Sequence, residues 1–155
     1  MKDHLVRNIS RVGVVFSVVL MLLVSINASA TDTHKGDNDW EYIVDEPTNY
    51  QNALKIGKNG GLLSLVLADH KKEVQISSSA GVLCEGFCTV LLFVDSGPPE
   101  AFKAYYENAI VLQSADDLFD RIVNSKTIEA TVTLAGGRST TFLFDTSNNP
   151  LVLNK

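Results

Sequence analysis

Residues 128–144 have the sequence IEATVTLAGGRSTTFLF, in which apolar and polar side chains alternate on both sides of a glycine pair. The residues that fall on one face of each arm are Ile128, Ala130, Val132, Leu134, Thr140, Phe142 and Phe144. An alternation with a period of two indicates half-buried antiparallel strands. The pair Gly136-Gly137 offers the positive φ angles that a tight turn needs. This stretch predicts a β-hairpin that packs one face against a core.

Shorter runs with the same alternation precede this hairpin, over 62–68, 73–78 and 88–95, and turn residues separate them. The run over 88–95 is apolar on both faces, which predicts a central strand. Only Ala115–Asn124 has helical spacing, with Ser114 placed to cap its first turn. The sequence therefore predicts a mainly β fold, an antiparallel β-sandwich or small barrel with one short α-helix over Ala115–Asn124.

The N-terminus has the features of an export signal. Basic residues at positions 2, 7 and 11 precede an uncharged apolar run from Val12 to Ile26, and Ala28-Ser29-Ala30 follows it. A spanning helix needs about 20 apolar residues, so this shorter run followed by small residues favours a cleaved signal peptide over a membrane anchor. We expect cleavage after Ala30.

Cleavage at this point defines the domain organisation. Residues 1–30 form the signal peptide, the polar residues 31–39 are expected to be a flexible linker, and residues 40–155 form a single β-rich domain. The expected compartment is the periplasm, and an extracellular location is also compatible with export. No cysteine lies near the cleavage site to carry a lipid, so no stable membrane anchor is expected.

The charge of the mature chain limits its partners. It keeps 10 of the 13 basic and 17 of the 18 acidic residues, which gives a net charge of −7 against −5 for the precursor. A negative surface argues against nucleic acid and anionic membranes as partners. An acidic protein attracts basic partners, although acidity also serves solubility.

The two cysteines, Cys84 and Cys88, are expected to form a disulfide, because an exported chain meets an oxidising compartment. Redox enzymes use a C-x-x-C spacing beside a helix, whereas here the spacing is C-x-x-x-C beside a strand. A zinc site would need two further ligands, and the remaining histidines, His34 and His70, lack metal-ligand spacing.

No catalytic constellation emerges from the sequence. A hydrolase could pair His70 with one of Ser77-Ser78-Ser79, but no G-x-S-x-G elbow is present. Asp116 and Asp117 are adjacent on a helix and are better explained by its dipole than by glycosidase chemistry. The glycine clusters at 57–61 and 136–137 lack the order of a phosphate loop. We therefore predict no catalytic, cofactor-binding or metal-binding residues and no cofactor.

Three aromatic residues are the only sequence indication of a binding surface. Trp40, Tyr42 and Tyr50 lie close together in the sequence and are candidates for contact with a partner. A role in the core or at a sheet edge is the alternative, since aromatic residues on strands are commonly buried.

One order of elements is more specific than composition. The pair Cys84 and Cys88 leads into a strand that ends in the sequence FVDSGPP over 93–99, and a helix and the sequence FLFD over 142–145 follow. This order resembles a loosely defined group of Gram-negative periplasmic proteins and, more distantly, the invasion-associated locus B family. The resemblance implies a secreted β-sandwich associated with the envelope or with host interaction. It supplies no catalytic residues.

These observations together predict an exported, non-enzymatic binding or accessory protein of the cell envelope with a protein partner. One alternative is an inhibitor or immunity protein that neutralises a basic envelope-targeting enzyme. Another is a small periplasmic hydrolase. The sequence does not specify the oligomeric state.

Overall fold

The computed structural model describes residues 32–35, 39–69, 71–113 and 116–151. The predicted signal peptide, its cleavage site, His70 and the Ser114 cap lie outside these residues. No helix in the described ranges has the length and apolar character needed to cross a bilayer.

The described residues form strands, one short 3-10 helix (η2) and one α-helix. In chain order they are β1 (Asp32–Lys35), β2 (Trp40–Asp45), η2 (Glu46–Thr48), β3 (Tyr50–Ile56), β4 (Gly61–Ala68), β5 (Lys71–Ser78), β6 (Phe87–Val94), β7 (Glu100–Tyr106), β8 (Ile110–Leu112), α1 (Asp116–Val123), β9 (Thr127–Thr133) and β10 (Ser139–Asp145).

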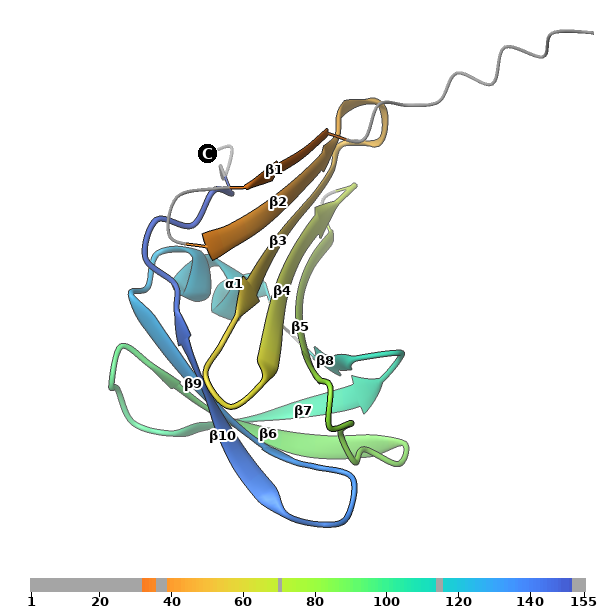
Figure 1. The fold of residues 1–155 in the computed structure, drawn as a ribbon, viewed down its shortest axis with the longest axis vertical. Coiled ribbons are helices and arrows are strands. Elements are labelled where there is room, and N and C mark those ends of the chain that lie inside the picture. Colours follow the sequence, from red (N-terminus) through yellow and green to blue (C-terminus); the bar gives the residue numbers. More distant parts are fainter. Residues whose placement is uncertain (1–31, 36–38, 70, 114–115, 152–155) are drawn as a thin grey trace, which may run out of the picture.

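All strands belong to one antiparallel sheet in the order β1-β2-β3-β4-β5-β8-β7-β6-β9-β10. The sheet curls so that its two halves face each other, and α1 lies between them (Figure 1). Pairing of β5 with β8 joins the halves. The predicted mainly β antiparallel fold with one short helix is confirmed, and its form is an open sheet that curls toward a barrel.

The C-terminal hairpin is confirmed in detail. Strands β9 and β10 pair so that Phe142 lies opposite Ala130 and Phe144 lies opposite Ile128. All four side chains are fully buried. The turn glycines, Gly136 and Gly137, have φ angles of 96° and 79°. The local alternation therefore determines both the register and the buried face.

Helix α1 covers the concave face of the sheet. Its buried side chains are Leu118, Phe119 and Ile122. On its exposed side, Lys72 Nζ of β5 donates to both carboxylate oxygens of Asp120 at 2.7 and 2.8 Å. Arg121 makes a bidentate pair with Glu100 of β7 at 2.9 and 3.1 Å. The helix is thus held by apolar packing and by one ion pair to each half of the sheet.

The N-terminal segment differs from the sequence prediction. A flexible linker is expected over residues 31–39, but Asp32–Lys35 form β1, which pairs with β2 from Asp32 opposite Val44 to Lys35 opposite Glu41. An edge strand needs only main-chain hydrogen bonds from its neighbour, which even a polar sequence supplies. The expectation is therefore wrong for these four residues.

Strand β6 is central in its pairing, because it lies between β7 and β9. It is not buried on both faces as its composition suggests. Val90 and Leu92 are buried, while Phe87 and Leu91 on the opposite face are exposed. The helix covers only the concave side of the sheet, so the convex side of β6 faces solvent.

The predicted disulfide is confirmed. Cys84 and Cys88 are bonded, with their Cα atoms 5.2 Å apart. Gly86, inside the loop, has a φ of 76°, in the left-handed region that glycine adopts without strain. The loop closes immediately before β6.

We expect the double substitution Cys84→Ala and Cys88→Ala to lower the free energy of unfolding by about 2 kcal/mol, because a loop this short restricts the unfolded chain only modestly. Urea denaturation of the oxidised protein with and without a reductant measures this difference. The reductant should destabilise the wild type and leave the double variant unchanged. Two thiols reactive in the native oxidised protein would contradict the disulfide.

Candidate functional site

The curled sheet is bridged where the loop between β3 and β4 meets β10, at an isolated pairing of Lys58 with Leu143. The Lys58 N–H donates to Leu143 O at 2.9 Å, and Asn59 Nδ2 donates to Thr141 O at 2.9 Å. Two glycines permit this approach. A Cβ atom on Gly57 would lie 2.5 Å from the Phe144 ring, and one on Gly61 would lie 2.4 Å from Phe142 Cγ. We call this contact the seam.

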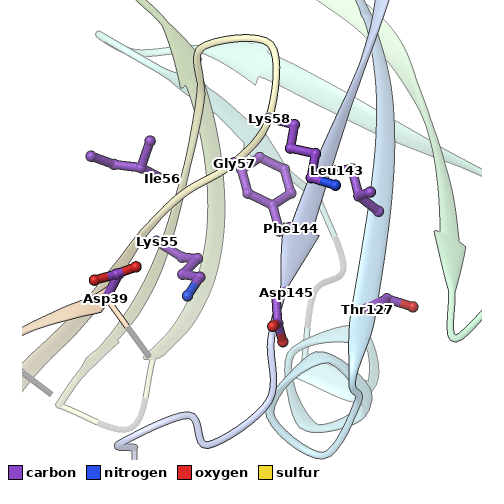
Figure 2. Close-up of a pocket in the computed structure, with 9 residues that line it drawn as sticks. All are labelled: Asp39, Lys55, Ile56, Gly57, Lys58, Thr127, Leu143, Phe144 and Asp145. Carbon is purple, nitrogen blue, oxygen red and sulfur yellow. The ribbon is translucent and has the colours of Figure 1, made fainter. Parts of the chain in front are cut away.

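A hollow of about 580 Å³ lies at the seam between β3 and β10. It is lined by Asp39, Lys55, Ile56, Gly57, Lys58, Thr127, Leu143, Phe144 and Asp145 (Figure 2). Among the described residues that line this seam hollow, two are lysines and two are aspartates. Figure 2 shows the ring of Phe144 beside Gly57 and the side chain of Ile56 pointing away from β10.

Lys55 lies on the concave face although it is charged. The residue is only 6% exposed, and its Nζ is 5.7 Å from the centroid of the Trp40 ring. Trp40 lies opposite Lys55 in the pairing of β2 with β3. A cation above an indole face is stabilised by the ring quadrupole, which helps to explain how this position accepts a lysine.

Asp145, at the end of β10, faces the same hollow. Hydrogen bonds from Ser147, and the positive charge of Lys55, hold the pKa of its carboxyl below the ordinary value of 3.8. The Ser147 N–H donates to Asp145 Oδ1 at 3.0 Å. Ser147 and Lys55 therefore stabilise the ionised form of the Asp145 carboxyl.

We expect Asp145→Asn to weaken the dependence of stability on acid pH. Because the pKa of Asp145 is lower when folded than when unfolded, its contribution is present above the unfolded pKa and is lost as the pH falls through the folded pKa. Urea denaturation between about pH 5 and pH 3 should show a shallower loss of stability in Asp145→Asn than in the wild type. Glu85→Gln, which neutralises an exposed loop carboxyl, is the control. Equal slopes in all three proteins would contradict the role of Asp145.

A second hollow, of about 540 Å³, lies on the other side of β3. It is lined by Asp39, Glu41, Leu54, Ile56 and Leu62 and opens on the convex face of β2, β3 and β4. We call it the outer hollow. The two hollows share Asp39 and Ile56, and the side chain of Ile56 is 71% exposed between them.

The side chains at the end of β3 reverse the usual pattern. Lys55 is buried, and its neighbour Ile56 is the most exposed large apolar side chain among the described residues. Surface positions on a soluble strand normally carry polar side chains. Departures from this pattern concentrate at functional or strained sites, so the surface around Ile56 is the candidate functional site.

No family model, curated protein or solved structure gives a significant match to this chain. The resemblance to the invasion-associated locus B family stays a prediction.

The structure does not bring the three predicted aromatic residues together. Trp40 is fully buried, and its Nε1 donates to Ser147 O at 3.1 Å. Tyr42 is half-buried on the same concave face and donates its hydroxyl to Gln51 Oε1 at 2.8 Å; burial raises its pKa above 10.0. Tyr50 lies on the convex face, where its hydroxyl accepts from Asn52 Nδ2 at 3.2 Å. The prediction that these three residues share an aromatic contact surface is therefore wrong, and Trp40 belongs to the core.

The hydrolase candidates gain no support from the geometry. Ser78 Oγ accepts a hydrogen bond from Ala80 N at 3.2 Å, which is a turn role. Asp117 is exposed on α1. Within the described ranges, no group of three or more His, Cys, Asp or Glu side chains is arranged to hold a metal ion.

The disulfide loop forms a separate exposed apolar feature. Phe87 is 68% exposed and Leu83 is 41% exposed, on either side of the Cys84–Cys88 loop. Neither residue lines the seam hollow or the outer hollow. Phe87 therefore serves as a matched reference for the effect of exposed apolar area alone.

Proposed function

We propose that this protein is an exported, non-enzymatic binding protein of the cell envelope, and that it docks a protein partner over Ile56. The observation that carries the proposal is the inverted pattern at the end of β3, with Ile56 71% exposed beside the buried Lys55. An isolated exposed apolar residue is ordinary. Here Ile56 lines two adjacent hollows of about 580 and 540 Å³. A protruding apolar side chain between two hollows suits a partner with a complementary surface.

The seam supports the proposal through its rigidity. Ile56 ends β3 and is followed by the loop that is hydrogen-bonded to β10 at Leu143 and Thr141. Because the backbone on both sides of Ile56 is hydrogen-bonded, this segment loses little conformational entropy when a partner binds. The disulfide is compatible with an oxidising compartment such as the periplasm.

An inhibitor or immunity protein against a basic enzyme is the second candidate function. The specific feature that favours it is the pair of carboxyl groups, on Asp39 and Glu41, that lines the outer hollow beside Ile56. Opposite charges across an interface raise the rate of association and select the partner.

The test replaces Ile56 with serine and compares it with Phe87→Ser, since the two side chains have similar exposure. Immobilised wild type and Phe87→Ser should retain the same protein from an envelope extract of the producing cells. Ile56→Ser should bind that protein at least about tenfold more weakly, as expected for loss of an apolar anchor. Both variants should unfold within about 0.5 kcal/mol of the wild type. Equal retention by Ile56→Ser, or loss confined to Phe87→Ser, would contradict the proposal.

A further inference from the structure

A third hollow, of about 340 Å³, lies on the convex face over the C-terminal end of β4. The strand order explains its form, because β4 lies between β3 and β5 (Figure 1). Strand β4 contributes the short side chains of Val66 and Ala68, and its two neighbours contribute longer, polar ones. We call this the β4 hollow. It is lined by Tyr50, Asn52, Val66, Ala68, Lys71, Glu73 and Gln75.

Hydrogen bonds hold the polar side chains on the β3 side of the β4 hollow. Ser64 Oγ donates to Asn52 Oδ1 at 2.8 Å, and Asn52 Nδ2 donates to the Tyr50 hydroxyl at 3.2 Å. These two bonds fix the orientation of the Asn52 amide, since its oxygen accepts and its nitrogen donates. The Tyr50 ring gives this side of the hollow a rigid surface with an apolar body and a polar tip.

The side chains on the β5 side also hold one another. Gln75 Nε2 donates to Glu73 Oε2 at 2.8 Å, and Lys71 forms an ion pair with Glu73 Oε1. The hydrogen bond from Lys71, with a further one from Gln75, keeps the pKa of the Glu73 carboxyl below its ordinary value, although burial acts in the opposite direction. Among the described residues that line the hollow, the two charged ones therefore offset each other.

The β4 hollow combines an apolar floor with a rim of hydrogen-bonding groups. Each amide at the rim has two N–H donors and a carbonyl acceptor, and Lys71 has three donors, so the rim has more donors and acceptors than its internal bonds use. Small-ligand sites have this composition and volumes of about 300 to 1,000 Å³. The hollow is therefore suited to a small, uncharged ligand with many polar groups.

We propose that the β4 hollow binds a neutral pyranose ring of a glycan. A pyranose has a face of C–H groups that packs on apolar side chains, and hydroxyls around its edge that both donate and accept hydrogen bonds. The C–H face lies on Val66 and Ala68 beside the Tyr50 ring, and the hydroxyls bond to the amides and the carboxylate of the rim. Because the rim side chains already hold one another, they lose little conformational entropy when the sugar binds.

This inference goes beyond the proposed function. Tyr50 begins β3, whereas Ile56 ends it, and Ile56 does not line the β4 hollow. The protein partner and the glycan would therefore occupy different places on the molecule.

Other ligands fit the β4 hollow less well. An anion would be repelled by the carboxylate of Glu73. A large apolar side chain would remove water from Asn52 and Glu73 without replacing its hydrogen bonds, which is costly. The floor strand β4 is paired on both sides, with β3 and with β5, so an extended peptide cannot add to it as a further strand.

The test is an NMR titration of the protein with two soluble neutral trisaccharides, maltotriose and tri-N-acetylchitotriose. At least one of them, at millimolar concentration, should shift the backbone amide signals of residues 50, 52, 66, 68 and 73. The trisaccharide of galacturonic acid, whose rings carry carboxylates, should bind about tenfold more weakly than that neutral sugar. Absence of shifts with both neutral sugars, or equal or tighter binding of the acidic one, would overturn the inference.

Matched variants locate the sugar. Gln75→Met keeps the length of the side chain and removes its hydrogen bonds, and Tyr50→Ala removes the ring; each should lower the affinity by about tenfold. The controls, Gln113→Met and Tyr106→Ala, make the same changes at residues outside the hollow and should change the affinity by less than about twofold. The amide spectrum verifies that each variant is folded. Equal losses in a variant and its control would overturn the inference.

The variants also keep this inference apart from the proposed function. Ile56→Ser should lose the envelope protein and keep the sugar, whereas Gln75→Met should lose the sugar and keep the protein. If Gln75→Met and Tyr50→Ala bind the sugar as tightly as the wild type, the inference fails and the proposed function stands. If Ile56→Ser retains the envelope protein, the proposed function fails whatever the sugars do.

Discussion

Replacing Gly61 with alanine is expected to lower the free energy of unfolding by about 3 kcal/mol. The added Cβ would lie 2.4 Å from Phe142 Cγ and 2.8 Å from Phe142 Cβ. Phe142 is fully buried and has no free direction in which to move. Gly61 also accepts a hydrogen bond from the Gly57 N–H at 2.8 Å, so a shift of β4 would disturb the loop that forms the seam. Urea denaturation followed by circular dichroism measures the loss.

Gly137→Ala is the control for this prediction. A Cβ on Gly137 meets nothing within 4 Å, although its φ is 79°. Its cost should therefore be limited to backbone strain of about 1 kcal/mol. The double variant Gly61→Ala and Phe142→Leu should be more stable than the sum of its single changes predicts, because a smaller side chain relieves the overlap. The steric explanation fails if Gly61→Ala costs no more than Gly137→Ala.

The seam shows what sequence analysis could and could not provide. The C-terminal hairpin was predictable because its alternation and its glycine turn are local properties of residues 128–144. The seam joins Gly61 to Phe142 and Lys58 to Leu143, residues far apart in the chain. Gly57 lies in the loop between β3 and β4, and Gly61 is the first residue of β4. The need for close approach at both glycines comes from the curl of the sheet, which a local sequence pattern does not contain.

The candidate site was missed for a related reason. Along β3, alternation alone places Leu54 and Ile56 toward a core and Lys55 toward solvent. The structure has the opposite arrangement, because β3 pairs with β2 so that Lys55 lies opposite Trp40. The signal that was available in the sequence is a conflict, a lysine at a position that shares a face with Ala53. Such a conflict indicates that one of the two residues departs from the usual burial pattern, but it does not tell which face of β3 is buried.

The disulfide, by contrast, could be predicted from the sequence alone. The pairing of Cys84 with Cys88 follows from the presence of two cysteines in a chain expected to be exported, and it needs no knowledge of the fold. The exposure of Phe87 and Leu91 on β6 does require the fold, since it depends on which face of the sheet α1 covers. Covalent and local features were thus accessible, whereas burial on strands with two apolar faces was not.

The second prediction of large effect concerns Trp40. Trp40→Ala should lower the free energy of unfolding by about 4 kcal/mol, because it opens a cavity beside Lys55 and removes the hydrogen bond to Ser147 O. Trp40→Phe keeps most of the ring volume and should cost about half as much. Circular dichroism during urea denaturation measures both, since each variant lacks the only tryptophan of the chain.

The same variants decide between the two roles that the sequence allowed for Trp40. A core residue affects stability and leaves binding intact, so folded Trp40→Phe should retain the envelope partner as the wild type does, while Ile56→Ser should not. The tryptophan fluorescence of the native wild type should lie at short wavelength and resist quenching by iodide, because the side chain is 0% exposed. If Trp40→Phe loses the partner at unchanged stability, Trp40 acts at the interface and its burial in the free protein must be relieved on binding.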